Sequence, residues 1–99
     1  MDYRVILSRP ALRDLAEIAR YIAKDNPDAA LRVGDKLVSL AESLATMPRR
    51  GGLFRARPGV RRLVSAPYLL TYRIDETQRT VYVLRYWHAK REPDSWRAE

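Results

Sequence analysis

YLLTYRIDETQRTVYVLRY, residues 68–86, is the stretch that decides the fold of this chain. It contains two runs rich in β-branched and aromatic residues, 68–74 and 80–86, separated by a polar segment. Such runs favour β-strands, and the polar segment between them favours a reversal of the chain. Residues 60–65 form a third run of the same kind just upstream. The pattern predicts an antiparallel meander of three strands, in which residues 81–84, apolar on both faces, belong to a central strand.

The N-terminal part of the chain predicts one short strand followed by a helix. Residues 3–7 are β-prone, and Ser8 follows as an N-cap with Pro10 in the first helical turn. Apolar residues then recur at helical spacing: Leu12, Leu15, Ile18, Ala19 and Ile22. This apolar stripe predicts an amphipathic helix that runs to about Lys24.

A second helix is predicted to start directly after the first. Asn26 is a favourable N-cap, Pro27 suits the first helical position, and the apolar spacing continues until the helix must stop before Pro48. The short connection predicts an antiparallel helical hairpin. Gly34 lowers helix propensity in its interior, so we expect a close approach of the two helices there. Residues 49–59 contain three glycines and a proline and are predicted to form a basic loop, or a loop that holds a short strand.

Together these elements predict a single α+β domain over residues 1–99. The expected order is an N-terminal strand, an antiparallel α-helical hairpin and a three-stranded antiparallel meander (β-α-α-β-β-β). The helices would pack on one face of a mostly antiparallel, roughly four-stranded sheet. On the opposite, open face, alternation of side chains along the strands would gather Arg73, Arg85 and one of Arg61 or Arg62.

The composition excludes several classes of protein. The chain has no cysteine and one histidine, so we expect no disulfide, no metal site and no cofactor. No apolar run approaches the roughly 20 residues needed to span a membrane, and the N-terminus lacks the features of a signal peptide. A cytoplasmic location is therefore the simplest expectation.

The positive charge of the chain is concentrated in one region. The formal net charge is +7, and six arginines without an acidic residue lie in residues 49–62: Arg49, Arg50, Arg55, Arg57, Arg61 and Arg62. Such clustering indicates an anionic partner, either nucleic acid, a ribosome or an acidic protein segment. The alternative is that the charge serves solubility alone.

A polar cluster follows the last predicted strand: Trp87-His88-Ala89-Lys90-Arg91-Glu92. His88 could act as a general acid or base because its pKa ordinarily lies near 6.5. The alternative is a structural histidine that bonds a backbone carbonyl at the end of the strand. Arg85 and Arg91 could bind a target or a phosphate, or they could be solvated or paired with Glu92 or Asp94. Trp96 is expected to fold back onto the body of the domain.

Several stretches in register resemble the RelE/ParE superfamily, the toxins of bacterial type II toxin–antitoxin systems. The N-terminal stretches are Ser8-Arg9-Pro10-Ala11-Leu12-Arg13-Asp14-Leu15, Ile18-Ala19-Arg20-Tyr21-Ile22 and Asn26-Pro27-Asp28-Ala29-Ala30. The later stretches are residues 48–52, Gly59-Val60-Arg61-Arg62-Leu63, Tyr68-Leu69-Leu70-Thr71-Tyr72-Arg73-Ile74 and Leu84-Arg85-Tyr86-Trp87-His88-Ala89-Lys90-Arg91. The resemblance covers nearly the whole chain and implies the same fold.

The resemblance implies a growth-inhibiting toxin that is held inactive by a tightly bound, acidic antitoxin, and it is closer to the ParE-like branch. That branch implies poisoning of DNA gyrase, a role in plasmid stabilisation and no intrinsic catalysis. The RelE-like alternative implies mRNA cleavage on the ribosome, for which Arg85, His88 and Arg91 would be the catalytic residues. In RelE-like members a key strand arginine would fall at Val64, and a C-terminal tyrosine would fall where Trp96 and Arg97 stand. These departures favour the ParE-like branch.

The sequence therefore predicts a toxin that forms a hetero-oligomer with its antitoxin and does not act at a membrane. Candidates for contact with the target or with phosphate share a positive charge near or within the meander: Arg61, Arg62, Arg73, Arg85, Lys90 and Arg91. An alternative of another class is a basic nucleic-acid-binding module, which would bind naked DNA or RNA in a salt-sensitive manner.

Overall fold

Both helices begin at the predicted N-caps in the computed structural model, which describes residues 2–91. The Ser8 side-chain oxygen accepts the backbone N–H of Ala11 at 3.2 Å ahead of α1 (Arg9–Ala23). The Asn26 side chain accepts the N–H of Ala29 at 3.0 Å ahead of α2 (Pro27–Glu42). These bonds satisfy N–H groups that have no partner within the first turn of a helix. The helices form the expected antiparallel hairpin, and a 3-10 turn, η1 (Ser43–Ala45), ends it.

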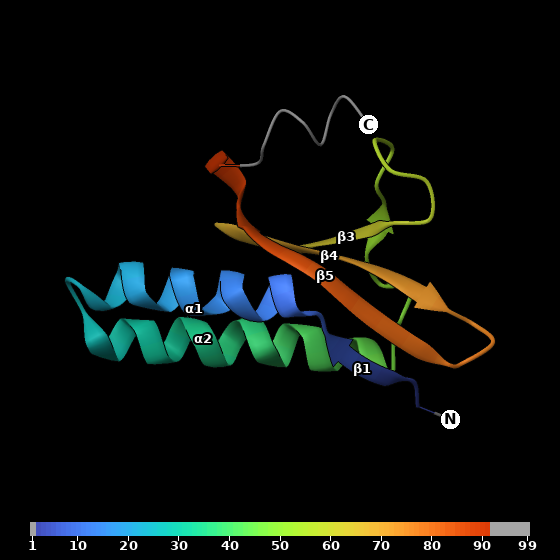
Figure 1. Cartoon of the computed structure of the whole chain (residues 1–99), viewed down its shortest axis with the longest axis horizontal. Coiled ribbons are helices and arrows are strands. Elements are labelled where there is room, and N and C mark those ends of the chain that lie inside the picture. The colour runs from blue at the N-terminus through green and yellow to red at the C-terminus, as the bar shows by residue number, and fades with distance from the viewer. Residues whose placement is uncertain (1, 92–99) are drawn as a thin grey trace.

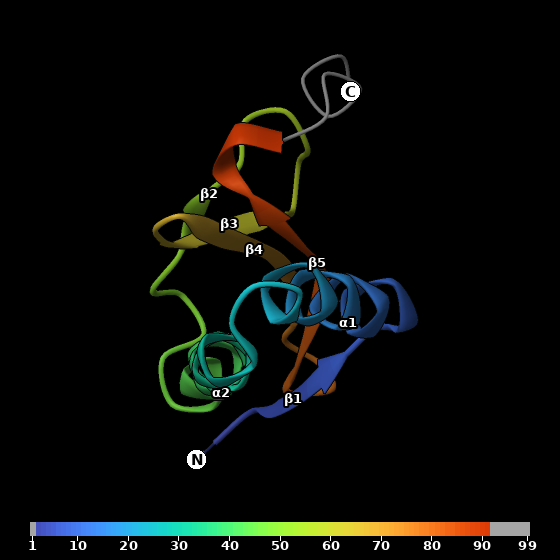
Figure 2. The same ribbon diagram turned by 90° about the vertical axis from the view of Figure 1, so that its left-hand side faces the viewer.

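The hairpin packs on one side of a five-stranded sheet (Figures 1 and 2). The strands are β1 (Arg4–Leu7), β2 (Gly52–Leu53), β3 (Arg61–Ser65), β4 (Tyr68–Asp75) and β5 (Thr80–His88), followed by a 3-10 turn, η2 (Ala89–Arg91). Their order across the sheet is β1-β5-β4-β3-β2. The α+β class and the order of elements are confirmed, and the basic loop holds the short strand β2.

The sheet is mixed, and the predicted antiparallel meander is confirmed in β3, β4 and β5. β1 pairs with β5 in parallel, and the other neighbours are antiparallel. The physical reason is burial of β5. Its first half is apolar on both faces and needs a strand on each side, and β1 supplies the second one. β5 is thus the central strand that its composition predicts.

β1 covers only the first half of the outer edge of β5, where it pairs with residues 80–83. Beyond that point, groups at the start of α1 replace a strand. The Ser8 N–H donates to the Val83 carbonyl at 3.0 Å, and the Ser8 hydroxyl donates to the Leu84 carbonyl at 2.9 Å. The Asp14 carboxylate accepts the Tyr86 N–H at 3.0 Å. The backbone groups along this edge of β5 are therefore hydrogen-bonded by Ser8 and Asp14, because the chain has already turned into α1.

An irregularity in the β4–β5 ladder sets which side chains of β5 face the core. Tyr72 lies opposite Val83 whereas Thr71 lies opposite Arg85, so β5 carries one extra residue, Leu84. This bulge shifts the alternation of β5 by one position. Tyr86 consequently points to the hairpin side with Val83, and Arg85 points to the open face.

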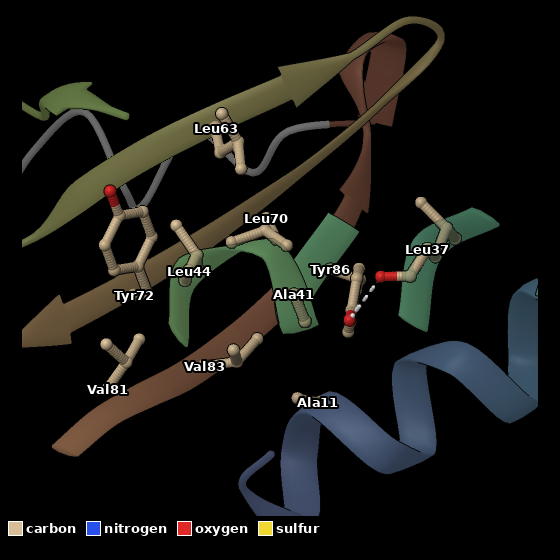
Figure 3. Packing of buried hydrophobic residues seen from close by; sticks show 10 residues of the cluster. All are labelled: Ala11, Leu37, Ala41, Leu44, Leu63, Leu70, Tyr72, Val81, Val83 and Tyr86. Atoms are coloured by element: carbon tan, nitrogen blue, oxygen red, sulfur yellow. Dashed lines mark hydrogen bonds between the residues drawn. The ribbon is translucent and has the colours of Figure 1, made fainter. Parts of the chain in front are cut away.

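The core lies between the hairpin and the sheet and includes two buried tyrosines (Figure 3). The Tyr86 hydroxyl donates to the Leu37 carbonyl at 2.9 Å. The Tyr72 hydroxyl donates to the Pro48 carbonyl at 2.7 Å and accepts the Gly51 N–H at 2.9 Å. Burial raises the pKa of both tyrosines, in Tyr72 against the lowering effect of the Gly51 N–H and nearby arginines. Tyr72 and Tyr86 therefore serve as packing residues of the core.

The expectation of a close helix–helix approach at Gly34 is wrong. A Cβ added to Gly34 would meet no atom within 4 Å, so the space beside it is open. The predicted fold-back of Trp96 lies outside the described residues. Within residues 2–91, neither helix combines the length and apolar character needed to cross a membrane.

Candidate functional site

The open face of the sheet carries a row of cationic side chains. Arg62 of β3 lies opposite Thr71 of β4, and Thr71 lies opposite Arg85 of β5, so the three residues form one cross-strand row. Arg73 lies on the same face, two residues along β4. Arg61 lies on the hairpin side and donates to the Gly51 carbonyl at 2.8 Å. The structure thus selects Arg62 over Arg61 for the open face, where it joins Arg73 and Arg85.

Each of the three arginines on the open face stacks on an aromatic ring. The guanidinium carbon of Arg62 lies 5.6 Å from the ring centre of Phe54. The corresponding distance is 4.7 Å from Arg73 to Tyr82 and 4.2 Å from Arg85 to Trp87. Stacking on an aromatic face orients a guanidinium. Arg62 and Arg73 are exposed, so this face suits an anionic or phosphate-bearing target.

Arg85 differs from the other two because an acid within the fold engages it. Its Nε donates to Asp14 Oδ2 at 2.7 Å and its terminal N–H group donates to Asp14 Oδ1 at 3.0 Å. This hydrogen bond to Asp14 raises the pKa of Arg85. The sequence had suggested that Arg85 could pair with Glu92 or Asp94, which lie outside the described residues. Its observed partner is Asp14, and the fork-to-fork geometry is the strongest kind for such a pair.

A cleft lies beside this ion pair, between α1 and the ends of β4 and β5. Its volume is about 410 Å³, and acidic, basic and phenolic groups beside the ion pair help to line it: Glu17, Tyr21, Tyr68, Arg85, His88 and Lys90. These groups come from four elements, so the fold brings together residues that are distant in sequence. Among the candidate site residues, Arg85, His88 and Lys90 meet here, whereas Arg61, Arg62 and Arg73 lie elsewhere on the sheet.

His88 is held at the end of β5 by two contacts. Its Nδ1 accepts the backbone N–H of Lys90 at 3.1 Å. Its ring meets that of Tyr68 edge-on, with centres 5.3 Å apart and planes at 82°. The expected backbone carbonyl partner is therefore wrong, because the η2 turn presents an amide instead. With Nδ1 accepting, the proton of neutral His88 sits on Nε2, so the nitrogen that could serve as a base is occupied.

Not every candidate residue can be placed at the cleft or on the open face. Lys90 is exposed, and Arg91 lies in η2, but its side chain is outside the described residues. In the basic loop, Arg49 forms an ion pair with Glu76, and Arg50 donates to the Ser43 hydroxyl at 2.7 Å. Part of the positive cluster is therefore used within the fold. Among the described residues, no group of three or more acidic or histidine side chains could hold a metal ion.

Sequence reasoning missed Asp14 and Glu17 as members of this region. Asp14 had a signal, because it shares the apolar side of α1 with buried Ala11, three residues away, and an acid there requires a partner. Glu17 had none, since an exposed glutamate on a helix is ordinary.

Comparison with known proteins places this geometry among bacterial toxins. The family model described as the ParE toxin of the type II toxin–antitoxin system parDE matches residues 5–93. A candidate toxin of Sinorhizobium fredii, Y4kP, is 42% identical, with 83% of each chain covered.

Two solved complexes have the same fold. The toxin–antitoxin complex RelBE2 of Mycobacterium tuberculosis contains a chain 32% identical, with a TM-score of 0.67, covering 89% of this chain and 99% of that one. The chromosomal ParDE system of Pseudomonas aeruginosa contains a chain with a TM-score of 0.74 and 23% identity, covering 87% and 95%. The second likeness is one of fold alone.

Proposed function

The chain belongs to the ParE toxin family of type II toxin–antitoxin systems, within the RelE/ParE superfamily, and we propose that it arrests growth by poisoning DNA gyrase. In this role the toxin acts by binding, and a cognate antitoxin keeps it inactive. The site of action is the cytoplasm, where gyrase and DNA are found.

One observation carries the choice of a binding toxin over a ribonuclease. Two of the three residues that RNA cleavage would use, Arg85 and His88, are engaged within the fold, and the side chain of the third, Arg91, lies outside the described residues. Arg85 is held by both oxygens of Asp14 and stacks on Trp87. Nδ1 of His88 is occupied by the Lys90 N–H. General acid–base chemistry needs a group within reach of the substrate proton and free to exchange it. These contacts instead suit residues that stabilise the end of β5.

The open face supplies the surface by which such a toxin would recognise its target. Arg62 and Arg73 are exposed and oriented by Phe54 and Tyr82. Stacked arginines favour carboxylate or phosphate groups, both of which a gyrase–DNA complex presents. Lys90 lies at the far end of β5 and extends the positive field in that direction.

An acidic antitoxin segment is the partner that the net charge of +7 favours. The RelBE2 and ParDE proteins are both toxin–antitoxin complexes, and we propose the same hetero-oligomeric state for this toxin. A segment of the antitoxin that is disordered alone would fold as a helix or strand when it binds.

Ribosome-dependent mRNA cleavage is the second candidate, and two observations favour it. The cleft collects a glutamate, tyrosines, an arginine and a histidine in one place, a set of groups that histidine-bearing members of the superfamily use for RNA cleavage. The chain is also 32% identical to the toxin chain of the RelBE2 complex. For cleavage, His88 would have to release its bond to Lys90 and Arg85 its bonds to Asp14.

Brief, tightly controlled induction in bacteria with separate labelling of new DNA and new protein tests the proposal. The gyrase mechanism predicts an early fall in DNA synthesis with a DNA-damage response. An immediate stop of protein synthesis with continued DNA synthesis would favour the ribosomal mechanism. If neither changes and the purified chain binds naked nucleic acid in a salt-sensitive manner, it is a binding module.

A further inference from the structure

The solvent-facing side of α2 carries a stripe that alternates acidic and apolar residues. Its members follow one another at spacings of three and four: Asp28, Leu31, Asp35, Val38 and Glu42. Leu31 is 70% exposed and Val38 is 37% exposed. A three–four spacing is that of a helix seam in contact with another helix, yet this stripe points away from the core.

α1 carries a matching stripe of opposite charge. Leu12 is 53% exposed, and the residues that follow it on the same side are all small: Ala16, Ala19 and Ala23. Beside them along the outer side of the helix lie three exposed arginines: Arg9, Arg13 and Arg20. The stripe on α1 is therefore flanked by basic residues, whereas the stripe on α2 contains acidic ones and has the exposed Arg32 beside it.

The two stripes lie along the boundary between α1 and α2 on the outer side of the hairpin. Asp14 marks the flank of α1 that contacts β5, and helix rotation puts Leu12 and Ala16 on the opposite flank, toward α2. Figure 2 shows the helices nearly end-on and side by side on one side of the sheet. The helices run antiparallel, so the corresponding flank of α2, reached by the same angle around the helix axis from its core-facing side, faces α1. Leu31 and Val38 lie on that flank. Gly34 lies between these two, and a Cβ there would meet nothing within 4 Å, so there is open space beside it.

Six charged side chains lie beside this boundary. Counting only residues 2–91, none of them forms an ion pair within the chain: Arg9, Arg13, Arg20, Asp28, Asp35 and Glu42. Exposed apolar side chains bordered by unpaired charges of both signs indicate a surface that is completed by a partner.

We propose that this face binds the same face of a second copy of the chain, so that two hairpins form an antiparallel four-helix bundle. A two-fold axis parallel to the helices places α1 of one copy over α2 of the other. Arginines then face acids on both sides of the interface, and the exposed leucines and Val38 are buried at its centre. A two-fold axis perpendicular to the helices would instead place α1 of one copy over α1 of the other, and their arginines would repel each other.

Symmetry also fixes which charges meet. A rotation about an axis parallel to the helices does not change the position of a residue along that axis. Residues of α1 and α2 that lie at the same position along the hairpin therefore also lie opposite each other across the interface. α1 ends at Ala23 and α2 begins at Pro27, which makes three pairs level to within about 3 Å. These pairs are Arg9 with Glu42, Arg13 with Asp35, and Arg20 with Asp28.

The dimensions of the face predict a weak dimer. The 16 residues of α2 span about 24 Å, and two adjacent helices are about 20 Å wide. The product, about 480 Å² per copy, is below the roughly 800 Å² of a standard interface. We therefore expect a reversible dimer whose population depends on concentration.

Sedimentation velocity of the purified full chain across a wide range of concentration tests the proposal. We expect a monomer–dimer equilibrium. Arg13→Glu and Asp35→Arg should each weaken it about tenfold or more, and the double variant should restore it. Lys36→Glu is the matched control, because Lys36 lies on the other side of α2 and should leave the equilibrium unchanged. All three positions are exposed, and circular dichroism checks the fold.

A chain that stays monomeric at every concentration would overturn the proposal. So would a dimer that is insensitive to the charge reversals, or a double variant that is weaker than both single ones. Toxicity does not enter this measurement, so its outcome is independent of the proposed function.

Discussion

Asp14 in α1 and Arg85 in β5 are joined by two hydrogen bonds, and the same Asp14 carboxylate accepts the backbone N–H of Tyr86. One side chain thereby connects the helical hairpin to the part of β5 that β1 leaves uncovered. It also engages Nε and one terminal nitrogen of Arg85 within the fold. The ion pair is thus a structural support, and it accounts for an arginine within an otherwise apolar strand.

Replacing Asp14 by alanine should destabilise the fold. The substitution leaves the half-buried Arg85 guanidinium and the Tyr86 N–H without their acceptor. A hydrogen bond to a charged group contributes about 1.5–3 kcal/mol, so we expect a loss of about 2–3 kcal/mol in the free energy of unfolding. Urea denaturation measures it. Asp14→Asn, which keeps an acceptor for Tyr86, is the control and should lose less. A loss below about 0.5 kcal/mol for the alanine variant, a value typical of surface positions, would contradict the structural role.

Stability should fall at alkaline pH because of Tyr72 and Tyr86. Burial raises the pKa of both, whereas in the unfolded chain they titrate near the ordinary value of about 10. Above that pH the unfolded state loses protons that the folded state retains, so unfolding becomes more favourable as the pH rises. Each tyrosine contributes a slope of up to about 1.4 kcal/mol per pH unit. The test is to measure the free energy of unfolding between pH 9 and 11, a range that brackets the ordinary tyrosine pKa of about 10. Tyr86→Phe should flatten the decline, and an unchanged slope in that variant would refute the assignment.

Two glycines should respond oppositely to alanine. Gly34 lies in α2 with open space where a Cβ would go, so Gly34→Ala should stabilise the chain by about 0.5–1 kcal/mol through helix propensity. A Cβ at Gly51 would lie 2.7 Å from the Arg62 carbonyl oxygen and 2.8 Å from the Tyr72 hydroxyl. Gly51→Ala should therefore destabilise the fold by about 1–3 kcal/mol. Chemical denaturation of both variants, at concentrations where the chain is monomeric, measures the difference. Equal effects would show that neither site is as described.

The elements could be predicted from sequence because each has a local signal. The N-caps Ser8 and Asn26 and the apolar periodicity of α1 and α2 placed both helices, and β-rich runs placed β3, β4 and β5. The parallel pairing of β1 had no local signal, because it depends on where the whole chain returns. Nor did the sequence indicate which β5 side chains face the core, since the extra residue, Leu84, is recognised only from the pairing of β5 with β4.

The candidate site was predictable only in part for the same reason. Arg73, Arg85 and one of Arg61 or Arg62 were expected on one face from strand alternation, and the structure places Arg62 there with the other two. The engagement of Arg85 by Asp14 spans 71 positions in the sequence, a contact that no spacing rule reports. Arg61 and Arg62 are adjacent arginines, and only the register with Tyr72 and Thr71 separates their faces.

Charge reversal on the open face should reduce toxicity without unfolding the protein. Arg62→Glu and Arg73→Glu place acids at exposed positions that we propose to face the target. Loss of such an interfacial charge costs about 2 kcal/mol or more, about thirtyfold in affinity. Growth arrest after induction should therefore require much higher expression of either variant. Lys36→Glu makes the same kind of change on the hairpin and should stay toxic. Full toxicity of both sheet variants would remove the open face from the proposed mechanism.

His88 separates the two candidate mechanisms most directly. Nδ1 accepts the Lys90 N–H at 3.1 Å, and an asparagine oxygen occupies nearly the same place as Nδ1 relative to the backbone. His88→Asn should therefore keep the η2 turn and full growth arrest if the histidine is structural. His88→Leu fills similar space without an acceptor and should lower stability by about 1 kcal/mol. A ribonuclease would lose its activity in both variants, because asparagine cannot exchange a proton near neutral pH. Growth arrest and thermal stability, measured side by side for the two variants, distinguish these cases. Loss of arrest in a stable His88→Asn protein would make His88 catalytic and move the toxin to the ribosomal mechanism.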